Sequence, residues 1–342
     1  MSFQRDNSAF QAKQTEVQVN HDELFFSCTD DRGVITAANP VFERISGFSW
    51  TELNNAPHKI VRHPEMPKGM FHLIWDRLKR GVSTGAYVLN QSKDGQAYWV
   101  FAVMSPIENG FISLHFKPSA PLFEALHDIY KNALEAEKEG LSAQDSAAKI
   151  LADLNALGYA DYDAFETHAL GAEVQARDSI LKRSGNKLLA TLTAMSVELM
   201  ALSTEQKKLF GFFEAIRGIP SNMRIVASRL EPAGGPISAI SQNYRLMSDE
   251  VQGHLNGFRS NCDKDTVSAV VSERVRNVIF LVSAAALYAE LNENCLVANE
   301  AIKSDATQID IPAVLSGLQS YYGKDSVQAL TIVSRDVVGL AR

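Results

Sequence analysis

Cysteine is scarce in this chain, and positive charge is not in excess. The 342 residues include three cysteines, Cys28, Cys262 and Cys295, which are odd in number and far apart. No CxxC pair and no histidine at a metal-ligand spacing accompanies them, which argues against a disulfide scaffold and a zinc site. The formal net charge of -7 argues against a basic surface for nucleic acid. We therefore expect no nucleic-acid partner.

Long apolar runs are also few. The stretch Val278–Ala289 is the longest that we identify, and Ser283 interrupts it. Because a helix needs about 20 apolar residues to cross a bilayer, this run predicts a buried helix and no membrane insertion. The first residues lack the pattern of a secretory signal peptide. We therefore expect a soluble, cytoplasmic protein.

The common catalytic motifs are absent as well. The sequence has no P-loop, no Gly-x-Ser-x-Gly elbow, no cyclase signature and no glycine-rich nucleotide lid. No histidine is followed by an acidic residue in the manner of a kinase phospho-acceptor. His254 lies on an apolar helical stripe, where packing explains it. These absences predict that the protein is not an enzyme.

What the sequence does have is a short loop rich in proline and in proton-exchanging groups, between Pro57 and Pro67. Prolines fix φ and remove backbone donors, so this stretch predicts a rigid loop. The loop carries His58, Arg62 and His63, a combination that suits an anionic or redox-active ligand. The alternative is a polar surface loop whose side chains make ordinary hydrogen bonds.

The residues around this loop predict a small α+β unit. The stretches 24–27 and 34–36 favour strands, and an Asp-Arg-Gly turn separates them. Residues 66–80 have helical spacing. Residues 85–116 indicate three strands, because they contain two hairpin turns. The expected fold is a five-stranded antiparallel sheet with short helices.

This order, with the motifs in it, resembles a PAS sensor domain over residues 20–118. Within that fold it resembles the FAD-binding PAS domain of bacterial aerotaxis receptors. The residues that carry the resemblance are Ser27-x-Thr29-Asp30, Ile35-Thr36-x-Ala38-Asn39, Ser46-Gly47-Phe48, Glu52-Leu53, Pro57-His58-x-Ile60-Val61-Arg62-His63-Pro64-x-Met66-Pro67, Trp75, Asn90, Asp94-Gly95 and Tyr98-Trp99. The resemblance implies non-covalently bound FAD, a redox signal and no catalytic turnover.

The resemblance also implies which residues hold the cofactor or support its pocket. The candidate cofactor-binding residues are Asn39, His58, Arg62, His63, Glu65, Trp75, Asn90 and Trp99. Glu65 stands where the family has Asp. After Gly81 the family has a tryptophan that packs on the cofactor, and this chain has none there. Because large aromatics are usually buried, Trp75 and Trp99 are also explained as ordinary core residues.

The second half of the chain predicts an all-α region. Two stripes of apolar residues at heptad spacing flank a less regular tip, which favours an antiparallel helical hairpin or two arms of a dimeric bundle. Residues 222–241 resemble a degenerate chemoreceptor signalling tip, although Pro232 and Pro236 depart from that pattern. The expected segments are an N-terminal cap (1–19), the PAS domain (20–118), connecting helices (119–187), the hairpin (188–260) and C-terminal helices packed on the hairpin (261–342).

Together these patterns predict a redox or oxygen sensor of the energy-taxis type, which binds FAD and signals through its helical region. We expect a homodimer, and the tip implies a chemotaxis kinase or coupling protein as partner. One alternative is a cofactor-free PAS module for protein interaction or dimerisation. Another is a haem- or metabolite-binding PAS sensor with His58 or His63 as ligand.

Overall fold

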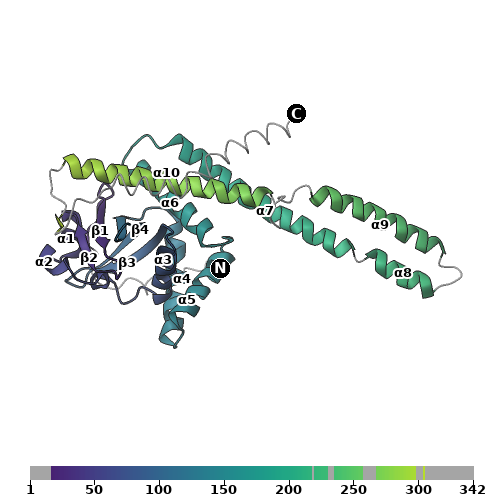
Figure 1. The fold of residues 1–342 in the computed structure, drawn as a ribbon, viewed down its shortest axis with the longest axis horizontal. Coiled ribbons are helices and arrows are strands. Elements are labelled where there is room, and N and C mark those ends of the chain that lie inside the picture. The colour runs from purple at the N-terminus through teal and green to yellow at the C-terminus, as the bar shows by residue number, and fades with distance from the viewer. Residues whose placement is uncertain (1–16, 218, 230–234, 257–266, 298–302, 305–342) are drawn as a thin grey trace, which may run out of the picture. The chain divides into compact units, whose positions relative to one another are not determined.

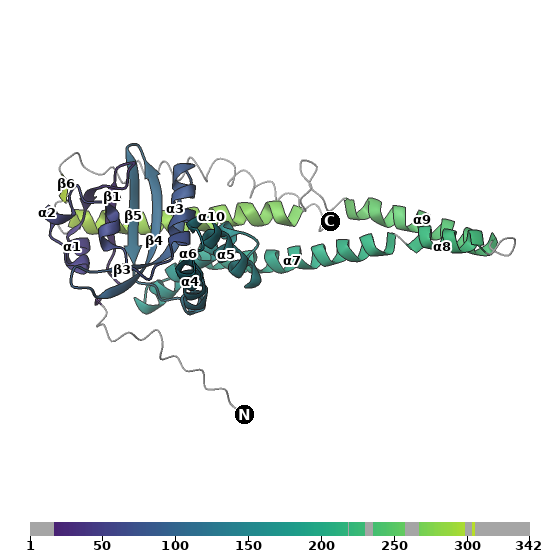
Figure 2. The ribbon, with the colours of Figure 1, turned by 90° about the horizontal axis from the view of Figure 1, so that it is seen from below.

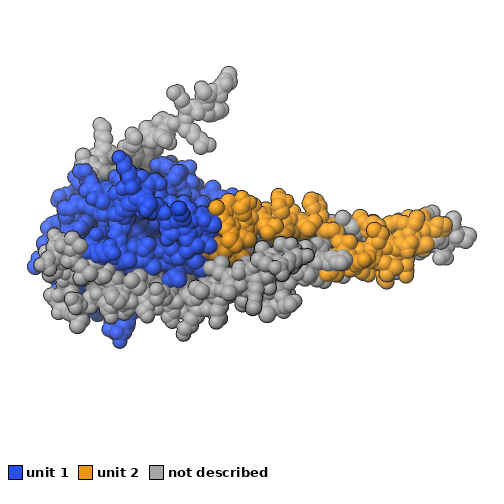
Figure 3. All heavy atoms as spheres, turned by 90° about the horizontal axis from the view of Figure 1, so that it is seen from above, with its two compact units in different colours: residues 1–193, 276–327 blue, residues 194–275, 328–342 orange. Residues whose placement is uncertain are grey.

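The computed structural model describes residues 17–217, 219–229, 235–256, 267–297 and 303–304. They belong to two compact units, coloured separately in Figure 3. Unit 1 contains residues 1–193 and 276–327, and unit 2 contains residues 194–275 and 328–342. Most of the expected N-terminal cap, the centre of the expected tip and most of the chain after residue 297 lie outside the described residues.

Unit 1 is built on the five-stranded antiparallel sheet that the sequence predicts (Figures 1 and 2). Its strands are β1 (Phe25–Thr29), β2 (Ile35–Ala38), β3 (Thr84–Gln91), β4 (Ala97–Ile107) and β5 (Gly110–Phe116). The order is β3-β4-β5-β1-β2, and the two-residue strand β6 (Lys303–Ser304) pairs with β2 at the edge. Gly110 opens β5 at a φ of 139°, where a Cβ would lie 1.9 Å from the Thr29 carbonyl oxygen. Only glycine fits this turn.

Short helices cover one face of the sheet, which we call the inner face. They are α1 (Pro40–Ser46), α2 (Trp50–Leu53), the 3₁₀ helix η1 (His58–Val61) and α3 (Lys68–Lys79). Asn39 caps α1, and Gly47 ends it in the left-handed conformation. The proline-rich loop expected from the sequence therefore includes one 3₁₀ turn.

The opposite, outer face packs against helices that follow the sheet in sequence. These are α4 (Leu122–Lys138), α6 (Tyr162–Ile180) and the part of α10 (Val267–Val297) that belongs to unit 1. Side chains alternate along a strand, so Tyr87 on β3 points to this face, where its ring contacts Phe101 and Phe165. The sheet is thus buried on both sides.

Buried carboxylates tie α6 to β3. Glu166 accepts hydrogen bonds from Thr84 Oγ1 at 2.7 Å and from the Gly85 backbone N–H at 2.9 Å. Glu173 accepts one from the Tyr87 hydroxyl at 2.8 Å. Burial raises the pKa of both carboxyls, that of Glu166 to about 8. Because β3 also carries inner-face residues, these contacts connect both sides of the sheet.

A further carboxylate fixes α3. Glu137 on α4 accepts hydrogen bonds from the first backbone N–H groups of α3, those of Lys68 and Gly69, at 2.9 and 2.8 Å. It thus replaces a side-chain cap that Pro67 cannot supply. Helix α5 (Ala143–Ala156) packs on α3, and a Cβ at Gly69 would lie 2.5 Å from Ser146 Oγ. The helices after the sheet therefore hold α3 in place.

The unit 1 part of α10 contacts the sheet and α6. The Tyr288 hydroxyl donates to the Val103 carbonyl oxygen at 3.3 Å, and Glu290 pairs with Arg177 of α6 at 2.7 Å. The sequence predicts a buried apolar helix here, and one face of it is buried, including Ile279, Phe280 and Leu287. We expected the C-terminal helices to pack on the hairpin. The contacts of Tyr288 and Glu290 instead lie within unit 1, where this part of α10 packs against the outer face of the sheet and α6.

Unit 2 is helical. It contains most of α7 (Lys187–Arg217), together with α8 (Ile219–Arg229) and α9 (Gly235–Asn256), and α8 packs against α9. Several heptad positions, including Leu202, Leu209, Ile240 and Met247, are exposed. In the described part of the chain, one helical segment, Lys187–Phe213, is long and apolar enough to cross a membrane by length and composition alone. We did not identify this segment from the sequence.

Candidate functional site

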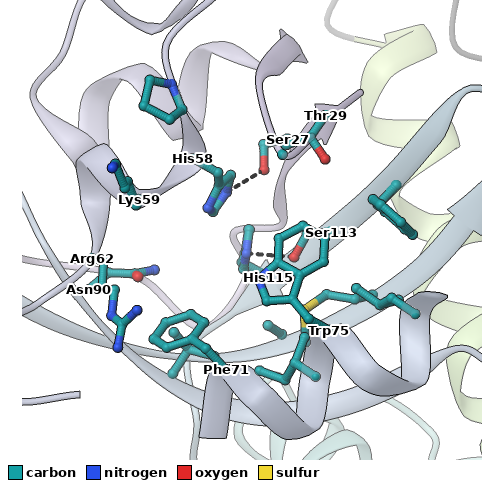
Figure 4. Close-up of a pocket in the computed structure, with 18 of the residues that line it drawn as sticks. Ser27, Thr29, His58, Lys59, Arg62, Phe71, Trp75, Asn90, Ser113 and His115 are labelled. Carbon is teal, nitrogen blue, oxygen red and sulfur yellow. Dashed lines mark hydrogen bonds between the residues drawn. The ribbon is translucent and has the colours of Figure 1, made fainter. Parts of the chain in front are cut away.

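A cavity of about 330 Å³ lies between the inner face of the sheet and the helices η1 and α3 (Figure 4). This volume is at the lower end of the range for small-molecule sites. Strands β1, β3, β4 and β5 form its floor. The polar and aromatic residues that line it are Ser27, Thr29, Arg32, His58, Lys59, Arg62, Phe71, Trp75, Asn90, Phe111, Ser113 and His115.

The charge of the lining is one-sided. Arg32, Lys59 and Arg62 contribute cationic groups, and none of the described lining residues is acidic. Arg32 already pairs with Asp30 at 2.9 Å, and its side chain is 80% exposed, so it contributes least. A cavity of this kind favours a ligand with an anionic part.

Arg62 is held between η1 and α3 beside β3. Its backbone forms an isolated antiparallel bridge with Asn90. Its guanidinium lies 3.9 Å from the centre of the Phe71 ring and donates to the Met66 carbonyl oxygen at 3.4 Å. Burial lowers its pKa, while Glu137 acts in the opposite direction. This arrangement leaves donors of the planar fork available for a phosphate or carboxylate.

Asn90 lies next to Arg62 and is 3% exposed. Its Nδ2 is buried and has no hydrogen-bond partner among the described residues. A buried donor without an acceptor costs about 1–3 kcal/mol. A ligand that presents an acceptor oxygen or nitrogen here removes that cost, so Asn90 is a ligand-contacting candidate.

Two serine–histidine pairs form another polar part of the lining. Ser27 Oγ lies 2.9 Å from His58 Nε2, and Ser113 Oγ lies 2.8 Å from His115 Nε2. The two imidazole centroids are 6.2 Å apart, and the ring planes are inclined by 27°. Burial lowers the pKa of His58 to about 4 and that of His115 to about 3, and His58 contributes to the second shift. Both rings are therefore neutral near pH 7.

Four of the predicted cofactor-binding residues line this cavity, namely His58, Arg62, Trp75 and Asn90. Asn39 and His63 are buried but do not line the cavity, and Glu65 is exposed. Asn39 joins β1 to α1, because its side chain accepts from the Phe26 backbone and donates to the Leu24 carbonyl. His63 Nδ1 accepts from the Glu65 backbone N–H at 3.1 Å. His63 therefore stabilises the proline-rich loop, whereas Asn39 connects β1 with α1.

Trp99 does not line the cavity, and we correct its assignment. It lies on the outer face, where its ring is 5.2 Å from that of Phe123 and 6.1 Å from that of Tyr130. The reason is the alternation of β4, since Tyr98 and Val100 take the inner face. Trp99 is therefore a partly buried packing residue of the outer face.

Phe71, Ser113 and His115 also line the cavity, although we did not predict them from the sequence. The signal for the two polar residues was available, because Phe111, Ser113 and His115 alternate along a strand and so share one face. A histidine in a predicted central strand indicates that this face of the sheet has a polar function besides apolar packing. Phe71 had no comparable signal, since its role depends on the position of Arg62.

Comparison with known proteins identifies the fold of this region. Residues 35–113 match the PAS fold family. The chain is 36% identical over 115 residues to the aerotaxis receptor of Escherichia coli K12, and 28% identical over 119 residues to the nitrogen fixation regulatory protein of Klebsiella pneumoniae. These matches cover 32% of this chain and 23% and 24% of the two relatives. The chain therefore spans about a quarter of the length of these relatives.

The solved structures that are similar to part of this chain include a light-oxygen-voltage domain and a PAS domain from Colwellia psychrerythraea. Each is 20% identical to this chain, with TM-scores of 0.29 and 0.24. They cover 32% and 28% of this chain, and 88% and 85% of their own. The family match and the sheet topology confirm the predicted fold: a PAS domain followed by a mostly helical region.

Proposed function

We propose that this chain binds FAD in the cavity of its PAS domain and acts as a redox or oxygen sensor of the energy-taxis type. The observation that carries the proposal is the cavity itself. It has cationic groups, no acidic residue among its described lining residues, and buried polar atoms that lack partners. The similarity of the PAS region to an aerotaxis receptor supports the same function.

The residues present fit this cofactor. Arg62 and Lys59 are suited to the pyrophosphate, and Asn90 Nδ2 to an acceptor atom on the edge of the flavin ring. Phe71 and Trp75 on α3 supply aromatic surface for the ring, which offsets the missing tryptophan after Gly81. When bound, FAD supplies a redox couple, and this function requires no substrate turnover.

A redox signal would leave the cavity through the strand and helix that form its walls. Asn90 and Val88 line the cavity from β3, and the same strand is held by Glu166 and Glu173 of α6. Trp75 lines it from α3, which Glu137 of α4 caps. A change in the hydrogen bond of Asn90 therefore acts on elements that are attached directly to the helices of unit 1.

The proposed assembly is a cytoplasmic homodimer. Exposed apolar residues at heptad spacing on α7 and α9, such as Leu202, Leu209 and Met247, favour pairing with a second copy. The tip, together with the similarity to an aerotaxis receptor, supports a chemotaxis kinase or coupling protein as the partner. Light scattering of the purified chain tests the dimer directly.

The experiment that tests FAD binding is a visible absorption spectrum of the purified chain, taken before and after dithionite. We expect oxidised-flavin bands that bleach on reduction, and FAD in the supernatant after denaturation. A Soret band would instead indicate haem bound by a histidine. A colourless protein that takes up no added FAD would leave a PAS interaction module and reject the redox function.

The two tryptophans that the sequence could not distinguish give a matched pair of variants. Trp75→Leu removes aromatic surface from the cavity, so we expect FAD affinity to fall roughly tenfold. Trp99→Leu removes packing on the outer face, so we expect unchanged FAD affinity and a free energy of unfolding lower by about 2 kcal/mol. FAD titration and denaturation of both variants check this. Weaker FAD binding by the Trp99 variant alone would contradict the geometry.

A further inference from the structure

The two serine–histidine pairs form a polar region of the cavity that is separate from Arg62 and Asn90. We call Ser27, His58, Ser113 and His115 the histidine pole. Figure 4 shows it on a different side of the cavity from Arg62 and Asn90. The pole comes from β1, η1 and β5, so three separate elements bring it together.

The pole is polar but uncharged. Each histidine has one ring nitrogen engaged by a serine hydroxyl. The aromatic rings of Phe25 and Phe42 pack against His115 at 5.1 and 6.1 Å, and the titratable group that acts on its ionisation is His58. The cations that line the cavity are Arg32, Lys59 and Arg62. A phosphate is therefore better held by those cations than by the pole.

One atom of the pole lacks a partner. His115 is 2% exposed, and its Nδ1 is buried without a hydrogen bond among the described residues. Ser113 already occupies its Nε2, so Nδ1 is the free position of the ring. Since the side chain lines the cavity, a polar atom of a bound ligand is the natural partner for this nitrogen.

We propose that the histidine pole is the subsite for the uncharged polar edge of a planar heteroaromatic ring, with His115 Nδ1 as its hydrogen-bonding contact. This inference rests on the proposed function, in which the ring is the flavin and the anionic part of the ligand lies at the cations. It adds a second contact on the ring, besides Asn90, and assigns it to β5.

The test compares FAD with riboflavin, which has the ring but no phosphate or adenine. Both are titrated into the full chain and its variants, and folding is checked by circular dichroism. We expect His115→Phe to weaken both ligands by the same factor, roughly tenfold, because the lost contact is to the ring. Arg62→Ala is expected to weaken FAD more than riboflavin. His72→Gln, on the exposed side of α3, is the matched control and leaves both affinities unchanged.

Each other result has a definite meaning. Wild-type-like affinities of the His115 variant for both ligands, or a loss for FAD alone, would overturn the pole as a ring subsite. A wild-type chain that binds FAD but no riboflavin would also overturn it, because the pole should hold the isolated ring. If neither ligand binds the wild type, the proposed function falls and the inference with it.

A second variant covers the case in which His115→Phe does not fold. Ser113→Ala keeps the imidazole but removes the partner of its Nε2, so the ring loses its orientation. We expect it to weaken FAD and riboflavin by equal, smaller factors. Equal binding to the wild type would count against the pole.

Discussion

Replacing Glu166 by alanine is expected to lower the free energy of unfolding of unit 1 by about 3 kcal/mol. The substitution leaves the Thr84 hydroxyl and the Gly85 N–H without an acceptor in a buried site. It also removes the buried carboxylate that pairs with Arg77. Each buried group left unsatisfied costs about 1–3 kcal/mol, and breaking a buried ion pair about 3–5 kcal/mol. Because Asp163 still pairs with Arg77 at 2.6 Å in the variant, we expect a loss at the lower end of the range for a buried ion pair.

Tryptophan fluorescence during chemical denaturation measures this loss, since all three tryptophans lie in unit 1. Asp163→Ala is the control, because that side chain is 57% exposed and its pair should contribute about 1 kcal/mol or less. Glu166→Gln keeps an acceptor for Thr84 and Gly85. Its NH2 group then faces the donors of Arg77, so this change is expected to cost less than alanine but still to lose the pair with Arg77. Equal stability of the Glu166→Ala variant and the wild type would show that the cluster does not hold α6 to the sheet.

The second large effect is acid destabilisation through the histidine pole. The folded-state pKa of His58 is lowered to about 4 and that of His115 to about 3, from an ordinary value of 6.5. Below pH 6.5 these histidines bind protons in the unfolded chain but not in the folded one. The free energy of unfolding therefore decreases as the pH falls. At pH 4.5 each histidine is expected to cost about 2 kcal/mol.

Denaturation curves at pH 7 and pH 4.5 measure this loss. In His115→Phe the ring is replaced by one that cannot be protonated, so we expect the difference between the two pH values to shrink by about 2 kcal/mol. If the His115 variant kept the wild-type difference, the imidazole of His115 would be hydrated or protonated in the folded protein, and the pole would not be neutral.

The sequence determined the PAS fold because its signals are local. Turn residues, strand alternation and the proline-rich block 57–67 each act within a few residues, so their order along the chain is enough to predict the sheet. The same block identified His58 and Arg62 as candidate site residues, because both belong to this stiff loop. Asn90 was identified through the resemblance to the aerotaxis-receptor PAS domain.

Tertiary structure alone decided which face each strand presents and what covers it. Trp99 and Asn90 lie in neighbouring strands, yet a one-residue difference in alternation puts Trp99 on the outer face and Asn90 in the cavity. The placement of His115 beside His58 depends on the register of β5 with β1, which no local pattern encodes. Glu166 and Tyr288 reach the sheet from helices 81 and 185 residues further along the chain than Gly85 and Val103. Such contacts depend on long-range packing, and only the folded chain brings these residues together.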